Sequence, residues 1–205
     1  MAFKCFWRRR SMVKIGFIVE GQTELILIQS TAFKNFLSHN NIELVNVINA
    51  DGSGNLLPHN IEGYIQILEK SGAEKIFILT DLDRDICITK TKERISARPQ
   101  DIVIIAVKTI EAWFLACTPV MQLLLDDMTF SFPEPEKEDV PFQTINDLLI
   151  HYTGRGIGRA AGKIKLVTRL LKLGLDLSLS ASHANCPSVK YFMQKISEVA
   201  RTATA

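Results

Sequence analysis

The sequence lacks the features of secreted, disulfide-bonded and membrane-spanning proteins. Its four cysteines are scattered and none belongs to a CxxC pair, which argues against a disulfide framework or a zinc site and favours a reducing compartment. Apolar runs such as residues 102–107 are far shorter than the ~20 residues of a membrane helix. Residues 1–11 are basic, but no apolar segment follows them, which argues against a secretory signal. We therefore expect a cytoplasmic protein without a membrane partner.

A large net charge is also missing, but the charges that make up the net value of +2 are unevenly distributed. Residues 12–150 carry 11 Lys and Arg against 20 Asp and Glu, whereas residues 151–205 carry 9 against 2. An acidic first part joined to a basic last part suggests a carboxylate-rich site beside a surface that attracts polyanions. The basic part could instead dock on the acidic part, and the two interpretations are compatible.

Apolar runs alternate with amphipathic segments through the first two-thirds of the chain. We expect strands at residues 14–19, 43–48, 76–80 and 102–108, separated by helices at residues 22–39, 56–71, 89–97 and 109–125. Near-continuous apolar strands that alternate with helices are typical of a parallel sheet covered on both faces. The predicted fold class is therefore α/β, with a Rossmann-type, mostly parallel four-stranded sheet and helices on both faces.

The sequence divides into four expected parts. Residues 1–11 are expected to be a disordered upstream extension, because the first apolar run opens at Met12 with MVKIGFIVEG. The α/β domain spans residues 12–130. A stretch rich in proline and acidic residues, FPEPEKEDVPF, marks a linker at residues 131–142. Residues 143–205 are expected to form a helical, basic C-terminal segment.

Acidic residues follow three of the four predicted strands. They are Glu20 and Glu24 after the first strand, Asp81 and Asp83 after the third, and Glu111 after the fourth. In an open α/β sheet, ligands bind beyond the carboxyl ends of the strands. A single carboxylate there is usually a helix-capping residue, but this many would repel one another without cations. Because hard oxygen ligands favour Mg²⁺ or Mn²⁺, we predict a site for one or two of these ions.

The run DLDRD after the third strand contains the most closely spaced carboxylates. Asp81 and Asp83 are two residues apart, so on an extended backbone both can face one side and share an ion. Asp85, the third aspartate of the run, is expected to be solvated instead.

The three acidic motifs, in this order, resemble those of the TOPRIM domain of primases, topoisomerases and certain nucleases. They are most similar to the OLD-type (overcoming lysogenization defect) nucleases, whose pattern is E-G-x-x-E, D-x-D and S-x-E. The motifs in this chain are Glu20-Gly21-x-x-Glu24, Asp81-x-Asp83 and Thr109-x-Glu111. They also resemble stand-alone TOPRIM-like proteins associated with phage defence. The resemblance covers roughly residues 13–115.

The resemblance implies a two-metal phosphodiester hydrolase that cleaves nucleic acid, with DNA as the expected substrate. The residues for one ion are Glu20, Asp81 and Asp83; those that help with the other are Glu24 and Glu111, with Thr109 in the place of the serine. OLD-type enzymes carry an ATPase domain on the same chain, and this sequence has no Walker A motif. We therefore expect regulation by a separate ATPase subunit or by assembly into a homo-oligomer.

OLD-type nucleases also use a lysine beyond the carboxylates to stabilise charge. Lys163 is the first candidate for this catalytic role and Lys108 the second, although either could belong to a solvated basic face. Lys163 closes the stretch GRGIGRAAGK, which is not a P-loop because position 157 is Ile, no Ser or Thr follows Lys163, and no strand precedes it. The glycines could admit a phosphate backbone beside Arg155 and Arg159, or form a plain flexible loop.

The basic residues after this stretch have helical spacing. On a helix from about residue 163, Lys165, Arg169 and Lys172 share one face, which we expect to stay open and to bind nucleic acid. The alternative function is a catalytically silent module that uses Mg²⁺ to hold a phosphate group or a partner protein.

Three further expectations concern structure rather than chemistry. Trp113 is expected in the core. His183 and Cys186 are expected to be turn residues before the last helix, and Ser188 is expected to cap that helix.

Overall fold

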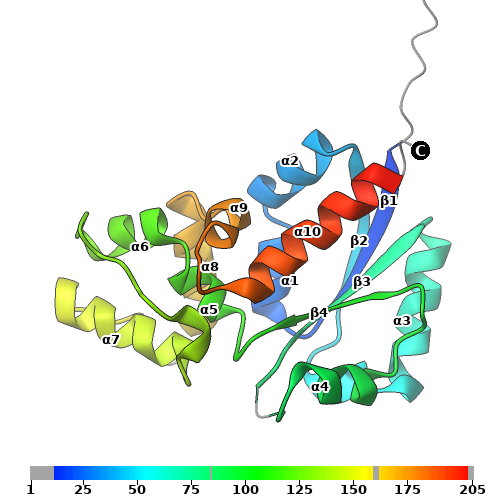
Figure 1. Ribbon diagram of the computed structural model, residues 1–205, viewed down its shortest axis with the longest axis horizontal. Coiled ribbons are helices and arrows are strands. Elements are labelled where there is room, and N and C mark those ends of the chain that lie inside the picture. Colours follow the sequence, from blue (N-terminus) through cyan, green and yellow to red (C-terminus); the bar gives the residue numbers. More distant parts are fainter. Residues whose placement is uncertain (1–11, 84, 159–161, 203–205) are drawn as a thin grey trace, which may run out of the picture.

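A four-stranded, all-parallel sheet forms the centre of the computed structural model, which describes residues 12–83, 85–158 and 162–202 (Figure 1). The strands are β1 (Val13–Val19), β2 (Ile42–Asn49), β3 (Lys75–Asp81) and β4 (Ile102–Ala106). Their order in the sheet is β2-β1-β3-β4. The predicted α/β class, with a parallel sheet flanked by helices, is confirmed.

Helices connect the strands and make up the C-terminal third of the chain. Those up to residue 125 are α1 (Gln22–Ile28), α2 (Thr31–His39), η1 (Ser53–Leu56), α3 (Pro58–Lys70), α4 (Ile88–Ile95), α5 (Glu111–Leu115) and α6 (Thr118–Leu125). The remainder are η2 (Pro135–Lys137), α7 (Pro141–Thr153), α8 (Gly162–Lys172), α9 (Leu177–Ala181) and α10 (Pro187–Thr202). Within the described ranges, no helix is both long enough and apolar enough to cross a membrane.

Three expected boundaries differ from the structure. The stretch 22–39 forms two helices, because Ser30 caps α2 by accepting a hydrogen bond from the Phe33 N–H at 3.2 Å. The stretch 109–125 also divides, into α5 and α6, with Pro119 in the first turn of α6. The fourth strand ends at Ala106, because Lys108 has a φ of +62° and leaves the extended region.

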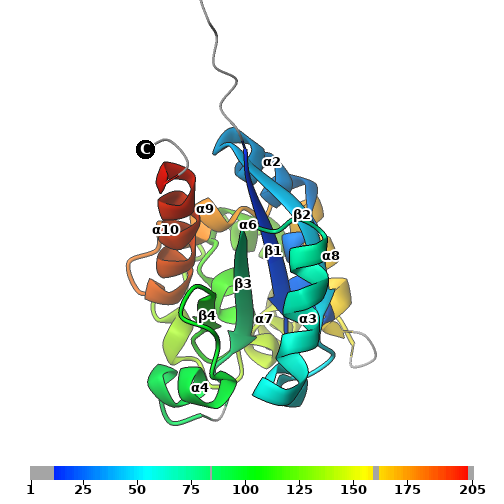
Figure 2. The ribbon, with the colours of Figure 1, turned by 90° about the vertical axis from the view of Figure 1, so that its right-hand side faces the viewer.

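The sheet is covered on both faces, as its apolar strands require. On one face α3 contributes Ile61, Ile65 and Leu68, at helical spacing, to a buried cluster with Ile18 and Ile78. Buried side chains of α1, α2 and α10 belong to the cluster on the other face. Figure 2 shows α3 on one side of β1 and β3 and α10 on the other.

Phe192 joins α10 to the sheet through contacts with four other buried aromatic rings, those of Phe17, Phe33, Phe77 and Trp113. It stacks on Trp113 and Phe33, with ring centroids 5.4 Å and 5.7 Å apart, and meets Phe17 in a T-shaped contact at 6.1 Å. All five side chains are buried, so the expectation for Trp113 is confirmed. Aromatic pairs of this kind contribute more than their buried area alone.

The C-terminal helices share the core of the sheet. Ile145 of α7, Leu166 of α8 and Phe192 of α10 belong to the same buried cluster as Phe17 and Phe77 of the central strands. The buried core therefore runs without a break across the linker expected at residues 131–142.

The segment 131–142 is itself attached to the start of α10. Glu136 accepts a hydrogen bond from the Ser188 N–H at 2.7 Å, and His183 Nε2 lies 2.9 Å from the Phe132 carbonyl oxygen. His183 and Cys186 lie between α9 and α10, as expected for turn residues. This segment is thus a packed connection on the surface of the core.

Ser188 is not the helix cap that the sequence suggested. α10 begins one residue earlier, at Pro187. The Ser188 hydroxyl oxygen accepts the indole N–H of Trp113 at 2.7 Å. Ser188 therefore satisfies a buried donor on α5 and links α10 to the segment after β4.

The aromatic cluster predicts where α10 derives its stability. Replacing Phe192 with Ala should lower the free energy of unfolding by about 3–5 kcal/mol, because it leaves a cavity among four rings. Replacing Tyr191, an exposed neighbour on the same helix, with Ala should cost less than about 1 kcal/mol. Urea denaturation followed by circular dichroism measures both, and equal losses would contradict the assignment.

Candidate functional site

The carboxyl ends of β1, β3 and β4 lie side by side, because these three strands are neighbours in a parallel sheet. Glu20 directly follows β1, Asp81 ends β3, and Glu111 opens α5 after β4. Glu24 lies one turn into α1, which follows Glu20. In Figure 1, α5, α6 and α7 lie beyond this end of the sheet. The chain therefore gathers four acidic residues at one edge.

Hydrogen bonds hold Glu20 and Asp81 in place. Glu20 Oε2 accepts the Thr80 hydroxyl proton and the Asp81 N–H, the latter at 3.1 Å. Asp81 Oδ1 accepts the Ile110 N–H at 2.8 Å. These contacts join the ends of β1 and β3 to the segment after β4. Thr80 was not singled out in the sequence, and only its place next to Asp81 at a strand end could have drawn attention to it.

Glu24 and Glu111 are buried more deeply than most acidic residues. Glu24 is 5% exposed and Glu111 is 0% exposed, although carboxylates are almost never fully buried unless paired. Gly21, between β1 and α1, lets the Glu24 carboxyl group lie close to its backbone, since a Cβ on Gly21 would be 3.2 Å from Glu24 Oε2. The glycine of the E-G-x-x-E motif thus leaves room for the second glutamate.

Burial and repulsion from neighbouring carboxylates raise the pKa values of Glu24 and Asp81. Burial raises the pKa of Glu24 from its ordinary 4.5 to about 7, and the charges of Glu111 and Glu20 add to the effect. Burial also raises the pKa of Asp81 well above its ordinary value, with contributions from the neighbouring carboxylates. The four groups therefore interact electrostatically as one cluster, hereafter the carboxylate cluster of Glu20, Glu24, Asp81 and Glu111.

Lys163, at the start of α8, reaches this cluster from a part of the chain far away in sequence. Its Nζ donates a hydrogen bond to Glu111 Oε2 at 3.2 Å and lies 3.1 Å from Oε1. Burial alone would lower the pKa of Lys163, but the charges of Glu111, Asp81 and Glu24 outweigh it and raise the pKa. The structure therefore places Lys163, the first candidate for the lysine, at the predicted site.

The cluster offers oxygen atoms that suit a divalent cation. Thr109 Oγ1 is buried and has no hydrogen-bond partner among the described residues, and unsatisfied buried polar atoms call for an explanation. Glu111 Oε1 is also buried, and the Lys163 ammonium group is its only partner among those residues. Carboxylate and hydroxyl oxygens are the ligands that Mg²⁺ and Mn²⁺ prefer. However, no three His, Cys, Asp or Glu side chains in the described ranges are already arranged to hold a metal. A cation would therefore have to draw at least one carboxylate out of its present contacts.

Asp83 does not share the extended backbone that the sequence suggested. β3 ends at Asp81, and Asp83 has a left-handed backbone with a φ of +49°. Its N–H donates to the Lys108 carbonyl oxygen at 2.8 Å, while its exposed side chain makes no hydrogen bond or ion pair with described residues. The argument that Asp81 and Asp83 face one side is wrong, and a metal-binding role for Asp83 stays a prediction.

Asp85 and Lys108 have other partners. Asp85 Oδ2 accepts from the Thr91 hydroxyl at 2.8 Å and forms an ion pair with Arg94 at 3.0 Å, so it is not simply solvated. The hydrogen bonds from Thr91 and Arg94 lower its pKa. Lys108 forms an ion pair with Asp139 at 2.6 Å. Both residues therefore stabilise loops around the site.

The expected basic face is exposed. Lys165, Arg169 and Lys172 are exposed on α8 and form no ion pair with described residues, while Leu166 and Leu170 between them are buried. Arg155 is also exposed. Arg159, the remaining predicted nucleic-acid contact, lies outside the described residues.

Two glycines of the stretch GRGIGRAAGK have a packing role. A Cβ on Gly156 would lie 2.6 Å from Asn146 Oδ1, and one on Gly162 would lie 2.7 Å from the ring of Phe142. Asn146 also accepts the Ile157 N–H at 2.8 Å. These glycines allow the chain to approach α7 closely just before it reaches Lys163.

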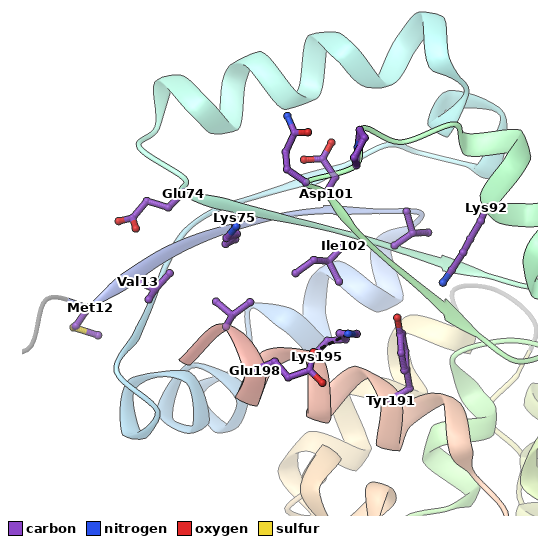
Figure 3. Close-up of a pocket in the computed structure, with 14 residues that line it drawn as sticks. Met12, Val13, Glu74, Lys75, Lys92, Asp101, Ile102, Tyr191, Lys195 and Glu198 are labelled. Atoms are coloured by element: carbon purple, nitrogen blue, oxygen red, sulfur yellow. Dashed lines mark hydrogen bonds and ion pairs between the residues drawn. The ribbon is translucent and has the colours of Figure 1, made fainter. Parts of the chain in front are cut away.

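A sizeable pocket lies away from the carboxylate cluster. It has a volume of about 770 Å³ and is lined by none of the predicted site residues. Figure 3 shows it at the opposite edge of the sheet, where Val13, Lys75 and Ile102 at the strand beginnings face Tyr191 and Lys195 of α10. Its mixed lining does not converge on one chemical group, so it does not displace the cluster as the candidate site.

Comparison with protein-family models, with curated proteins and with solved structures found no match to this chain. The assignment of the site therefore depends on its residues and geometry.

The raised carboxyl pKa values predict an unusual pH dependence of stability. Because Glu24 binds its proton more tightly in the folded state, the free energy of unfolding of metal-free protein should fall as pH rises from about 4.5 to about 7. Asp81 contributes in the same direction. Urea denaturation in EDTA across this range measures the effect.

Glu24→Gln should make this fall smaller, because the amide cannot ionise. Glu43→Gln, which changes an exposed carboxyl group on β2, should leave it as in the wild type. A wild-type protein whose stability rises between pH 4.5 and 7 would show that the cluster is not destabilised by its own charge.

Proposed function

We propose that this protein is a divalent-metal-dependent phosphodiester hydrolase that acts on nucleic acid, with DNA as the expected substrate. The observation that carries the proposal is the carboxylate cluster, whose four members come from three adjacent strand ends and meet one lysine, Lys163. Carboxylates buried this close together are costly in a purely structural role. Open α/β sheets bind ligands at this edge.

In this proposal the residues of the cluster have separate roles in binding the metal. Glu20 and Asp81, each fixed by hydrogen bonds on one oxygen, would hold Mg²⁺ or Mn²⁺, with help from Glu24, Glu111 and the free hydroxyl of Thr109. When bound, such an ion activates water and stabilises the charge on the phosphate oxygens. The protein's own part is to fix the carboxylates, to keep water out of the buried side of the cluster, and to hold the Lys163 ammonium group beside it.

The basic face of α8 would bring the substrate to this site. Lys165, Arg169 and Lys172 are exposed on the same helix whose first turn carries Lys163. Without such a surface, a cluster of carboxylates would repel a polyanion. Phosphate contacts of this kind position nucleic acid without reading its sequence.

The similarity of the three acidic motifs to the TOPRIM domain of OLD-type nucleases supports the same proposal. Each motif lies at the end of a strand in a parallel sheet, which is where the proposed chemistry needs it. A role in phage defence, with a separate ATPase subunit or a homo-oligomer as regulator, extends the proposal to biology and depends on the resemblance.

A second candidate function is a silent module that binds Mg²⁺ to hold a phosphate group or a partner protein. The observation in its favour is that no three acidic side chains in the described ranges are already arranged around a metal position. Turnover of nucleic acid separates the two candidates, because a binding module would retain the substrate without cleaving it.

The proposal predicts metal-dependent cleavage that requires Asp81. With Mg²⁺ or Mn²⁺ the wild type should cleave labelled DNA, and Asp81→Asn should reduce the rate at least about 100-fold, because a metal ligand supports several kcal/mol of charge stabilisation. Asp85→Asn is the matched control, since Asp85 belongs to the Thr91 and Arg94 contacts instead. Wild-type protein that binds DNA but never cleaves it with either ion would favour the silent module.

The basic face predicts salt-dependent binding. Replacing Lys165, Arg169 and Lys172 with Gln should weaken nucleic-acid binding and reduce the slope of log affinity against log salt by about one unit per lost contact. A control variant replaces exposed lysines on other helices, namely Lys34, Lys70 and Lys90. If both variants show the wild-type slope in filter-binding assays, α8 does not contact the phosphate backbone.

A further inference from the structure

Lys163 makes a contact with the carboxylate cluster that no other described Lys or Arg makes. Its Nζ lies 3.1 Å from Glu111 Oε1, and Glu20, Glu24 and Asp81 have no ion pair with a described basic residue. Glu111 is fully buried, whereas the Lys163 side chain is 48% exposed. The ammonium group thus enters the cluster from the solvent side.

The backbone next to Lys163 is fixed by packing at the first residue of α8. Gly162, the residue directly before Lys163, touches the ring of Phe142, and a Cβ there would lie only 2.7 Å from it. Earlier in the chain, Gly156 packs closely against Asn146 of α7, and the Ile157 N–H donates a hydrogen bond to the same side chain. Because Gly162 packs against Phe142 of α7, the backbone next to Lys163 is fixed, and the Lys163 side chain extends from it to Glu111.

The positive charge of Lys163 also offsets part of the negative charge of the cluster. Four carboxyl groups converge on a buried edge, and the Lys163 ammonium group lies within 3.2 Å of both oxygens of one of them, Glu111. One ammonium group pairs with only one of the four carboxyl groups, which leaves the other three able to bind a cation. Thr109 Oγ1 is buried and has no hydrogen-bond partner among the described residues, whereas the only partner of Glu111 Oε1 among them is the Lys163 ammonium group.

We propose that Lys163 is a built-in counter-ion that occupies the place of a divalent cation at Glu111, so that metal binding must release the Lys163–Glu111 ion pair. The inference rests on the metal binding of the proposed function and adds a competitor within the chain. It accounts for two facts together: the cluster has suitable oxygens, yet no three acidic side chains in the described ranges form a ready ligand set. Lys163 is then a positioning residue that sets how much metal the site needs.

The test follows the melting temperature of the protein during a Mn²⁺ titration without nucleic acid, because a ligand of the folded state raises stability by mass action. In Lys163→Met the half-saturating Mn²⁺ concentration should fall at least about fivefold, since the ion no longer competes with an ion pair. Lys165→Met removes the same charge two residues away on the exposed face and should change the midpoint less than twofold. Lys163→Arg keeps a cation and should stay close to the wild type.

Measurements in EDTA give a second, independent readout. Without metal, Lys163→Met should melt at a lower temperature than the wild type at pH 8, and Lys165→Met should not. A Lys163→Met midpoint equal to or above that of the wild type, or an unchanged melting temperature in EDTA, would overturn the inference while leaving the metal site intact. If the wild type itself shows no response to Mn²⁺, the proposed function fails and this inference fails with it.

Discussion

The cost of keeping carboxylates together at a buried edge is the constraint on which the rest of this structure depends. Glu24 and Glu111 are shielded from water, and the buried Asp81 donates its backbone N–H to Glu20. Buried charges are tolerated only when they are paired, protonated or bound to a cation. Two of these apply here: Lys163 pairs with Glu111, and burial raises the pKa of Glu24, which favours its protonated form. The remaining one, binding of a cation, is the function that we propose.

The fold supplies this edge and then supports it from several directions. A parallel sheet with β1, β3 and β4 adjacent brings three strand ends together, and the hydrogen bonds of Glu20 and Asp81 hold those ends in register. The helices after β4 share the core of the sheet and bring α8 to the open side of the cluster. The C-terminal part is therefore a component of the site as well as of the core, and the basic face of α8 lies on the same helix as the lysine that pairs with Glu111.

The periodicity of the sequence predicted the strands and the edge at which the acidic residues gather. It did not predict backbone turns or contacts between residues far apart in the sequence. Short apolar runs between helical segments predicted the parallel sheet, and acidic residues after those runs predicted the edge at which they meet. The left-handed backbone of Asp83 was missed, although Asp is uncommon in strands and tolerates this conformation better than most residues. The pairing of Asp85 with Arg94, and of Lys108 with Asp139, depends on how loops fold back. Lys163 was found through a resemblance, but its contact with Glu111 spans 52 residues of sequence.

The central claim is that the carboxylate cluster binds a divalent cation, and anomalous diffraction from crystals soaked with Mn²⁺ tests it most directly. The account predicts an anomalous peak within coordination distance, about 2.0–2.4 Å, of oxygens from Glu20 and Asp81, with the Lys163 ammonium displaced from Glu111. Crystals of Asp81→Asn should lack the peak under the same conditions. A peak only in the pocket at the opposite edge of the sheet, or no peak at the carboxyl ends of the strands at saturating Mn²⁺, would contradict the account.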